Sequence, residues 1–182
     1  MSRADHATIP PPPFDPAAAE RWMHRALELA REAAAAGDVP VGAVVVLDER
    51  IIGEGRNERE ATGDPTAHAE LLAIRRAARL VGRWRLDGVV LYVTLEPCAM
   101  CAGAVVCARV PRIVYGADDP KAGALVSRYT VGVDGRWNHV PEIRGGVRAA
   151  ECGRVLTEFF AARRSATSRP ADSIVDRKPR AE

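Results

Sequence analysis

The sequence contains two short motifs made of residue types that bind and use a metal ion. His68-Ala69-Glu70 forms the first, and Pro97-Cys98-Ala99-Met100-Cys101 forms the second. Zinc takes imidazole nitrogen and thiolate sulfur as ligands in tetrahedral geometry, and the spacing of the two cysteines puts them on one side of a helix. His68, Cys98 and Cys101 leave a fourth position to water. The motifs therefore predict a catalytic metal centre and not a closed structural one.

Glu70 is the residue expected to move protons at this centre. Two thiolates and a neutral imidazole balance the charge of Zn²⁺, and the metal still lowers the pKa of its bound water toward about 7. A carboxylate beside that water can take its proton and deliver it to a ring nitrogen and then to leaving ammonia. On one helix Glu70 would point about 200° away from His68, which favours a proton shuttle over a ligand. H-x-E combined with P-C-x-x-C is the signature of zinc-dependent nucleobase deaminases.

Both motifs are expected at helix starts that meet at one end of a sheet. Asp64 fits the N-cap and Pro65 the first position of a helix that runs to about residue 81. Pro97 is expected to start the next helix, and a buried strand over 89–95 joins the two helices. Helix N-termini stabilise thiolate anions through the helix dipole and the free N–H groups.

The rest of the chain alternates between helical and strand periods. Apolar residues recur at helical spacing from Trp22 to Ala34, and Gly37 ends that run. The further elements expected are a hairpin of 39–47 and 51–52 around the turn 48–50, a short strand 112–115 and a last helix over about 146–163. The order α-β-β-α-β-α-β-α predicts a layered α/β domain with a mixed sheet.

Length and composition fit one globular domain with short tails. The 182 residues are 47% hydrophobic and 27% charged, with a net charge of +2 that permits a nucleic-acid partner without arguing for one. Residues 1–19 are expected to form a proline-rich, extended or disordered leader, 20–163 the zinc-dependent deaminase domain, and 164–182 a charged, disordered tail. No apolar stretch approaches the ~18–20 residues that cross a membrane, and the polar N-terminus lacks a secretory core. We therefore expect a cytoplasmic protein with no membrane partner.

The other cysteines and histidines are not expected to bind the metal. Cys107 would point away from Cys98 on a helix, and it is interpreted, like Cys152, as a small buried hydrophobic residue. His24 is interpreted as an exposed or packing residue. His139 has no assigned role beyond a modest chance of substrate contact. A closed structural zinc site would need Cys107 or His139 as a fourth ligand.

Several further stretches make residues 20–163 similar to a known family. The chain resembles the bacterial tRNA adenosine deaminases, within the cytidine deaminase-like superfamily. The zinc motifs define only the superfamily, and DPTAHAE together with TLEPCAMCAGA and a terminal FF helix narrow the resemblance. The stretches that carry it are VPVGAV at 39–44, GEGRN at 53–57, DPTAHAE at 64–70, LYVTLEPCAMCAGA at 91–104, YGADDPKAG at 115–123, NH at 138–139 and ECGRVLTEFF at 151–160.

This resemblance implies a three-layer α/β/α fold with a central mixed five-stranded sheet. It implies hydrolytic deamination of adenosine to inosine at the wobble position of tRNA anticodon loops, with one Zn²⁺ per chain. It also implies a homodimer that binds the anticodon stem-loop. An anticodon loop can expose one base at modest cost, which a stacked duplex cannot. Water on zinc would attack C6 of adenine, and Glu70 would protonate the departing amine.

The resemblance also implies a set of substrate-binding residues. These are Asn57 for the target base, Val41 and Gly42 for the pocket wall, Asp119 and Lys121 for the loop near the RNA backbone, and Phe159 and Phe160 for the 5′-flanking nucleotide. Packing of the last helix on the core is the plainer interpretation of the two phenylalanines. The segment 123–127 departs from the family pattern because it lacks an expected Gly-Ser pair.

Two other functions fit part of the pattern. A deaminase of a free small molecule, such as guanine, cytidine, or a pterin or riboflavin precursor, would share the zinc site and differ in the pocket and loops. A zinc-stabilised RNA-binding module without catalysis would share the ligands alone. Glu70 argues against the module, because binding has no use for a carboxylate beside an open metal position.

Overall fold

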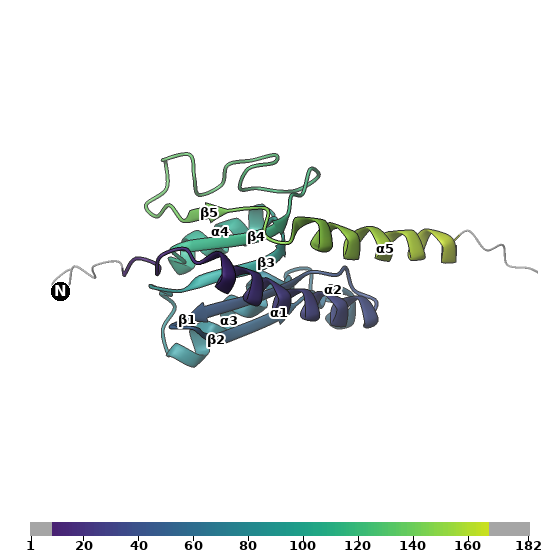
Figure 1. The fold of residues 1–182 in the computed structure, drawn as a ribbon, viewed down its shortest axis with the longest axis horizontal. Helices are drawn as coiled ribbons and strands as arrows, with labels where there is room; N and C mark the ends of the chain where they lie inside the picture. Colours follow the sequence, from purple (N-terminus) through teal and green to yellow (C-terminus); the bar gives the residue numbers. More distant parts are fainter. Residues whose placement is uncertain (1–8, 168–182) are drawn as a thin grey trace, which may run out of the picture.

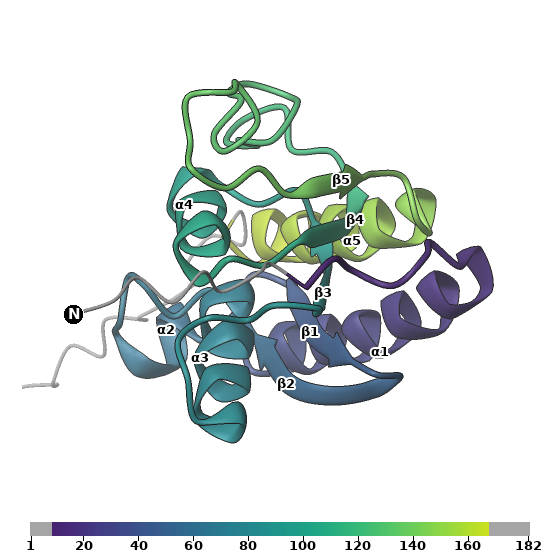
Figure 2. The same ribbon diagram turned by 90° about the vertical axis from the view of Figure 1, so that its left-hand side faces the viewer.

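The computed structural model describes residues 9–167. They form three layers, with one sheet between two layers of helices (Figure 1). Helices α3 and α4 cover one face of the sheet, and α1 and α5 cover the other (Figure 2). This is the predicted α/β/α arrangement. The elements in chain order are α1 (Pro16–Ala35), β1 (Gly42–Leu47), β2 (Arg50–Arg56), α2 (Arg59–Thr62), α3 (Ala69–Val81), β3 (Val90–Leu95), α4 (Ala99–Ala108), β4 (Arg112–Ala117), β5 (Glu142–Arg144) and α5 (Ala149–Thr167).

The sheet has five strands in the order β2-β1-β3-β4-β5. β1 pairs antiparallel with both β2 and β3, whereas β3 and β4, and β4 and β5, pair in parallel. The sheet is therefore mixed, as predicted. β2, β3 and β4 all run in one direction, so their carboxyl ends and the start of β1 lie at the same edge. Segments that follow those three strands meet there.

Each face of the sheet carries its own apolar core. One core packs α3 and α4 against side chains such as Val45, Leu91 and Ile113. The other packs α1 and the start of α5 against Val44 and Tyr92. Successive residues of β1 and β3 are buried in the two cores by turns, because side chains alternate between the faces of a strand and this sheet is covered on both faces.

Very small residues let α3 lie directly on β2. A Cβ atom built on Gly55 would lie 2.1 Å from the carbonyl oxygen of Ala69, and one on Gly53 would lie 2.3 Å from that of Ala73. Ala77 continues the same helix face one turn further on. Because the helix backbone touches the strand backbone, the first turn of α3 has a fixed position over the sheet edge.

The ordered part of the chain extends beyond the boundaries predicted for it. α1 begins at Pro16, because Pro16 suits the first helical position and the Asp15 carboxylate accepts a hydrogen bond from the N–H of Ala17. The prediction of a leader through residue 19 is therefore wrong at its end, although 9–15 belong to no helix or strand. α5 likewise continues to Thr167, past the predicted tail boundary at 164. The predicted disorder of 1–8 and 168–182 lies outside the described residues.

Two short elements were absent from the predicted order. β5 has three residues and α2 has four, which is too short for a period to show in the sequence. The order read from the sequence alone therefore has four strands, and the fifth came only from the resemblance. Within residues 9–167, no helix is long and apolar enough to span a membrane.

Candidate metal centre and active site

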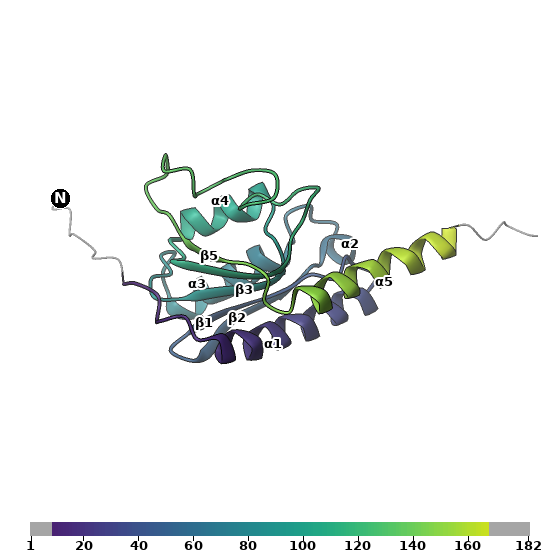
Figure 3. The same cartoon turned by 45° about the horizontal axis from the view of Figure 1, so that its top comes forward.

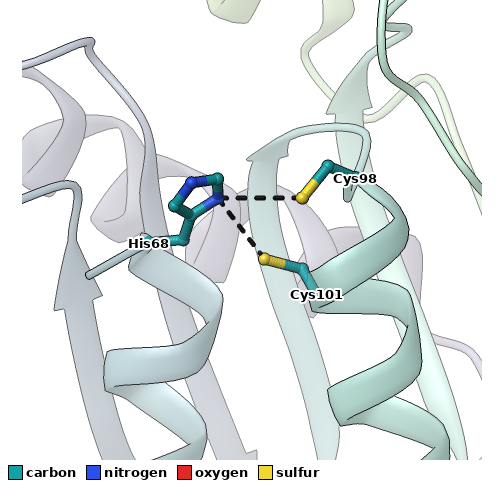
Figure 4. Close-up of side chains that lie close together, drawn as sticks. All are labelled: His68, Cys98 and Cys101. Carbon is teal, nitrogen blue, oxygen red and sulfur yellow. Dashed lines mark hydrogen bonds between the residues drawn. The ribbon is translucent and has the colours of Figure 1, made fainter. Parts of the chain in front are cut away.

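His68, Cys98 and Cys101 converge at the carboxyl edge of the sheet (Figure 4). The Nδ1 atom of His68 lies 3.8 Å from the sulfur of Cys98 and 3.6 Å from that of Cys101. One potential ligand atom from each residue lies within 4.8 Å of the other two. Among the described residues, this is the group of nitrogen and sulfur donors that a single ion could bind. The predicted ligands are thus together in space.

The local backbone explains why the three donors face one another. His68 is the N-cap of α3, and Cys98 is the N-cap of α4, each in an extended conformation. Cys101 lies on the first turn of α4. The expected helix start at Asp64-Pro65 is wrong, because Asp64 instead closes a turn by accepting the N–H of Thr66 at 2.8 Å. The expected start at Pro97 is two residues early.

The protonation of the cysteines suits a cation. Hydrogen bonds from the Cys101 thiol and from His68 lower the pKa of Cys98 to about 4. The hydrogen bond to Cys98, with burial, raises the pKa of Cys101, while the bond to Cys98 raises the pKa of His68. One thiolate is thus already favoured, and the set of two sulfurs and one imidazole nitrogen fits zinc.

Glu70 lies in the same recess as the metal-binding group. Glu70 is 4% exposed, and burial raises the pKa of its carboxyl group above the ordinary range. The carboxyl group also contacts Cys101 through a hydrogen bond. The predicted angle of 200° from His68 does not apply, because His68 precedes the helix and has an extended backbone. Both side chains therefore reach one site.

The recess beside these residues has a volume of about 200 Å³. Asn57 and Val41 belong to its wall, as expected, and both are nearly buried. Gly42 lies instead against α1, where a Cβ atom would come within 2.0 Å of the carbonyl oxygen of Ala26. The lining residues are Val39, Val41, Asn57, Arg59, His68, Glu70, Leu95, Glu96, Cys98, Asp119 and Ala122.

The loop after β4 forms one side of the recess. The Asp119 carboxylate accepts hydrogen bonds from the N–H groups of Lys121 and Ala122, at 2.9 and 3.1 Å. Asp119 thereby shapes the loop and also lines the recess. The side chain of Lys121 is exposed on the same loop.

Phe159 and Phe160 lie in the second half of α5, a helix that extends beyond the sheet (Figure 3). Their ring centroids are 5.4 Å apart in an edge-to-face arrangement, and the Arg163 guanidinium lies over the Phe159 ring. Phe160 is 42% exposed, and Phe159 is partly exposed. Neither ring is in the core, so the packing interpretation is wrong for Phe160.

Cys107, Cys152 and His139 lie away from the donors. Cys152 is buried, as predicted, and its sulfur lies 2.3 Å from the position that a Cβ atom on Gly116 would take. Cys107 is exposed, so its predicted burial is wrong, because the face of α4 opposite Cys98 is open to solvent at that position. His139 contacts the carbonyl oxygen of Val110 at 2.7 Å, just before β4 and so at the other end of the sheet.

Sequence reasoning missed two polar residues that line the recess, Glu96 and Arg59. Glu96 is 2% exposed and follows the end of β3 directly. A carboxylate between a buried strand and a metal ligand was the available signal. Arg59 had no comparable signal, because it is exposed and lies on the short helix α2 that the sequence did not reveal.

Known proteins share both the sequence and the fold. Residues 17–164 match the family model described as MafB19-like deaminase. The tRNA-specific adenosine deaminase of Haemophilus influenzae is 51% identical over 146 residues, which cover 80% of this chain and 84% of that protein. This chain belongs to the bacterial tRNA-specific adenosine deaminase family.

Solved structures support the same family and also include a guanine deaminase. A structure from studies of A-to-I editing by tRNA:A34 deaminases at the wobble position has a TM-score of 0.73 and 43% identity, covering 75% of this chain and 99% of that chain. The predicted cytidine deaminase-like fold is thereby confirmed. A guanine deaminase from Bacillus subtilis has a TM-score of 0.52 and 46% identity, covering 54% of this chain and 64% of that one.

Proposed function

We propose that this chain is a zinc-dependent hydrolase that converts adenosine to inosine at the wobble position of tRNA anticodon loops. The observation that carries the proposal is the His68, Cys98 and Cys101 group with buried Glu70 beside it in one recess. The family membership supports tRNA as the substrate, since the relative that is 51% identical is a tRNA-specific adenosine deaminase.

The metal is proposed as one zinc ion per chain, bound by His68, Cys98 and Cys101. When bound there, zinc supplies a water molecule activated for attack on C6 of adenine. Glu70 would take both protons of that water in turn at its carboxyl oxygen, delivering the first to the ring nitrogen and the second to the leaving amine. Burial raises the pKa of Glu70, which brings its proton affinity closer to neutral pH. Water is consumed, ammonia leaves and C6 keeps the oxygen.

The walls of the recess are proposed to bind the RNA. Asn57 is proposed to hydrogen-bond the base and Val41 to provide an apolar surface against it, since both line the recess. Asp119 and Lys121 on the neighbouring loop are proposed to approach the RNA backbone. Phe159 and Phe160 would offer rings on which a flanking base can stack, each such contact being worth about 1–3 kcal/mol.

We further propose that the chain is a cytoplasmic homodimer. The family resemblance supports both properties, and the structure adds a reason for pairing. Four large apolar side chains are exposed along the segment between β4 and β5, and such exposure is typical of an interaction surface. They are Val126, Tyr129, Trp137 and Val140, which are 63%, 54%, 41% and 52% exposed.

The direct test is incubation of the zinc-loaded chain with an anticodon stem-loop that carries adenosine at the wobble position. Parallel reactions contain a stem-loop with adenosine one position away, free adenosine, cytidine and guanine. Inosine in the RNA and released ammonia are measured together. We expect inosine in the wobble stem-loop and little product in the other reactions.

The guanine reaction decides between the proposal and its nearest alternative. The similarity to a guanine deaminase covers 54% of this chain. Ammonia from guanine without inosine in the stem-loop would contradict the proposed substrate and support a free-base deaminase. Stem-loop binding without any ammonia would support a binding module.

A further inference from the structure

Glu96 is a buried carboxylate with an unusual concentration of hydrogen bonds. One oxygen accepts the backbone N–H groups of Leu125, Val126 and Ser127, at 3.1, 2.7 and 3.0 Å. The other accepts the backbone N–H of Asp119 at 3.1 Å and the hydroxyl group of Ser127. All of these donors belong to the loop after β4.

The same loop is attached to the chain immediately after Glu96. The N–H of Ala124 donates to the carbonyl oxygen of Pro97 at 2.9 Å, and Gly123 forms an isolated β-bridge with Cys98. A Cβ atom on Gly123 would lie 2.2 Å from the nearer Glu96 oxygen. The loop thus closes around the carboxylate with no room for a side chain between them.

This arrangement connects the wall of the recess to the metal-binding segment. Asp119 and Ala122 line the recess from the loop, and Cys98 is two positions after Glu96. Hydrogen bonds to a charged acceptor are stronger than neutral ones and hold a fixed geometry in a buried place. The position of the wall relative to Cys98 is therefore set by this side chain together with the backbone contacts of Gly123 and Ala124.

We propose that Glu96 is a positioning residue that holds the 119–127 loop at the distance from Cys98 that the substrate requires. This rests on the proposed function, and it adds a residue that acts through the loop and not as a metal ligand. Its effect is on substrate binding, because a loosened loop must be ordered each time the substrate binds.

The test compares three variants of the full chain. Glu96→Gln keeps the shape but puts an amide NH₂ group among N–H donors. Ser127→Ala removes one of the hydrogen bonds and leaves the backbone ones. Asp87→Asn is the matched control, since Asp87 is another buried carboxylate, paired with Arg85 before β3 and so at the other end of the sheet.

The kinetic expectation is a rise in KM with little change in kcat. For Glu96→Gln, we expect KM for the wobble stem-loop to rise about 10-fold or more, which corresponds to losing charged hydrogen bonds. Ser127→Ala should show a smaller rise. Asp87→Asn should lower the thermal midpoint without changing KM. Zinc content should equal that of the parent in all three, because the proposed ligands lie at the starts of α3 and α4 and not on the loop.

Hydrogen exchange measures how well the loop amides are protected when no substrate is present. The amides of Leu125, Val126 and Ser127 should exchange at least about 10-fold faster in Glu96→Gln, and those of β3 should not. A loss of kcat or of zinc with unchanged KM would overturn the proposal, as would unchanged exchange of those amides. A parent chain that deaminates guanine and not the stem-loop would contradict only the proposed function, and the KM comparison would then use guanine.

Discussion

Helices α3 and α5 both carry residues proposed to meet the substrate, but they are built in opposite ways. α3 buries five residues, and its backbone touches β2 at Gly53 and Gly55. Among residues 149–165 of α5, Cys152 alone is buried, and the helix runs on past the edge of the sheet (Figure 1). The difference shows that the reacting groups are fixed by the core, while the rings proposed for recognition are left free to contact a partner.

The largest expected effect concerns the metal ligands at the starts of α3 and α4. The double variant Cys98→Ala, Cys101→Ala should lose most of its zinc and all detectable deamination, because one imidazole cannot hold the ion. Cys107→Ala is the matched control, since Cys107 is an exposed cysteine on the same helix. Zinc is measured by elemental analysis of purified protein. A double variant with full zinc content would remove the proposed site.

The second prediction concerns the close contact between α3 and β2. Gly55→Ala places a methyl group 2.1 Å from the carbonyl oxygen of Ala69, which must move the first turn of α3. We expect a stability loss of about 1–3 kcal/mol from overpacking. We also expect activity to fall by roughly 10²-fold, since a shift of about 1 Å at the reacting groups has that effect.

Gly153→Ala on α5 is the control for this change, because a Cβ atom there has open space around it. Urea unfolding and single-turnover kinetics on both variants separate stability from activity. If Gly55→Ala retained full activity at reduced stability, the exact position of α3 would not matter for catalysis.

The smallest expected effect lies on α5. Phe160→Ala should weaken stem-loop binding by about 5–150-fold, the range for one stacked base. Its stability should change by no more than about 0.5 kcal/mol, because the ring is 42% exposed. Filter binding at fixed salt measures the first, and urea unfolding the second. Unfolding of the variant, or unchanged binding, would make α5 a packing element after all.

The proposed metal ligands could be grouped from the sequence because zinc accepts few residue types and one geometry. His68, Cys98 and Cys101 followed from their chemistry, their spacing and the match to a known motif, and the structure brings them together. Where the helices begin could not be predicted in the same way. Asp64 and Pro65 satisfy the rules for a helix start, yet α3 begins after His68. Where α3 begins, Ala69 packs closely on Gly55 of β2. This is a tertiary contact, and no local sequence signal shows it.

Other features depend on partners that are distant in the sequence. Glu96 receives its hydrogen bonds from a loop 23 to 31 positions further on. β5 has three residues and is a strand because β4 lies beside it. Cys107 is exposed because no other described part of the chain covers α4 at that point. A helical period places Cys107 opposite Cys98 but cannot say whether that side faces the core or solvent.

The central claim is that Glu70 is the proton shuttle and not a ligand, and one measurement tests it most directly. Inosine formation is followed in single-turnover reactions with Glu70→Ala and Glu70→Gln, and zinc is determined on the same samples. The account predicts parental zinc content and parental stem-loop binding, with a rate lower by at least about 10²–10⁴-fold. Near-normal deamination would contradict the mechanism, and zinc lost together with activity would make Glu70 part of the metal-binding structure instead.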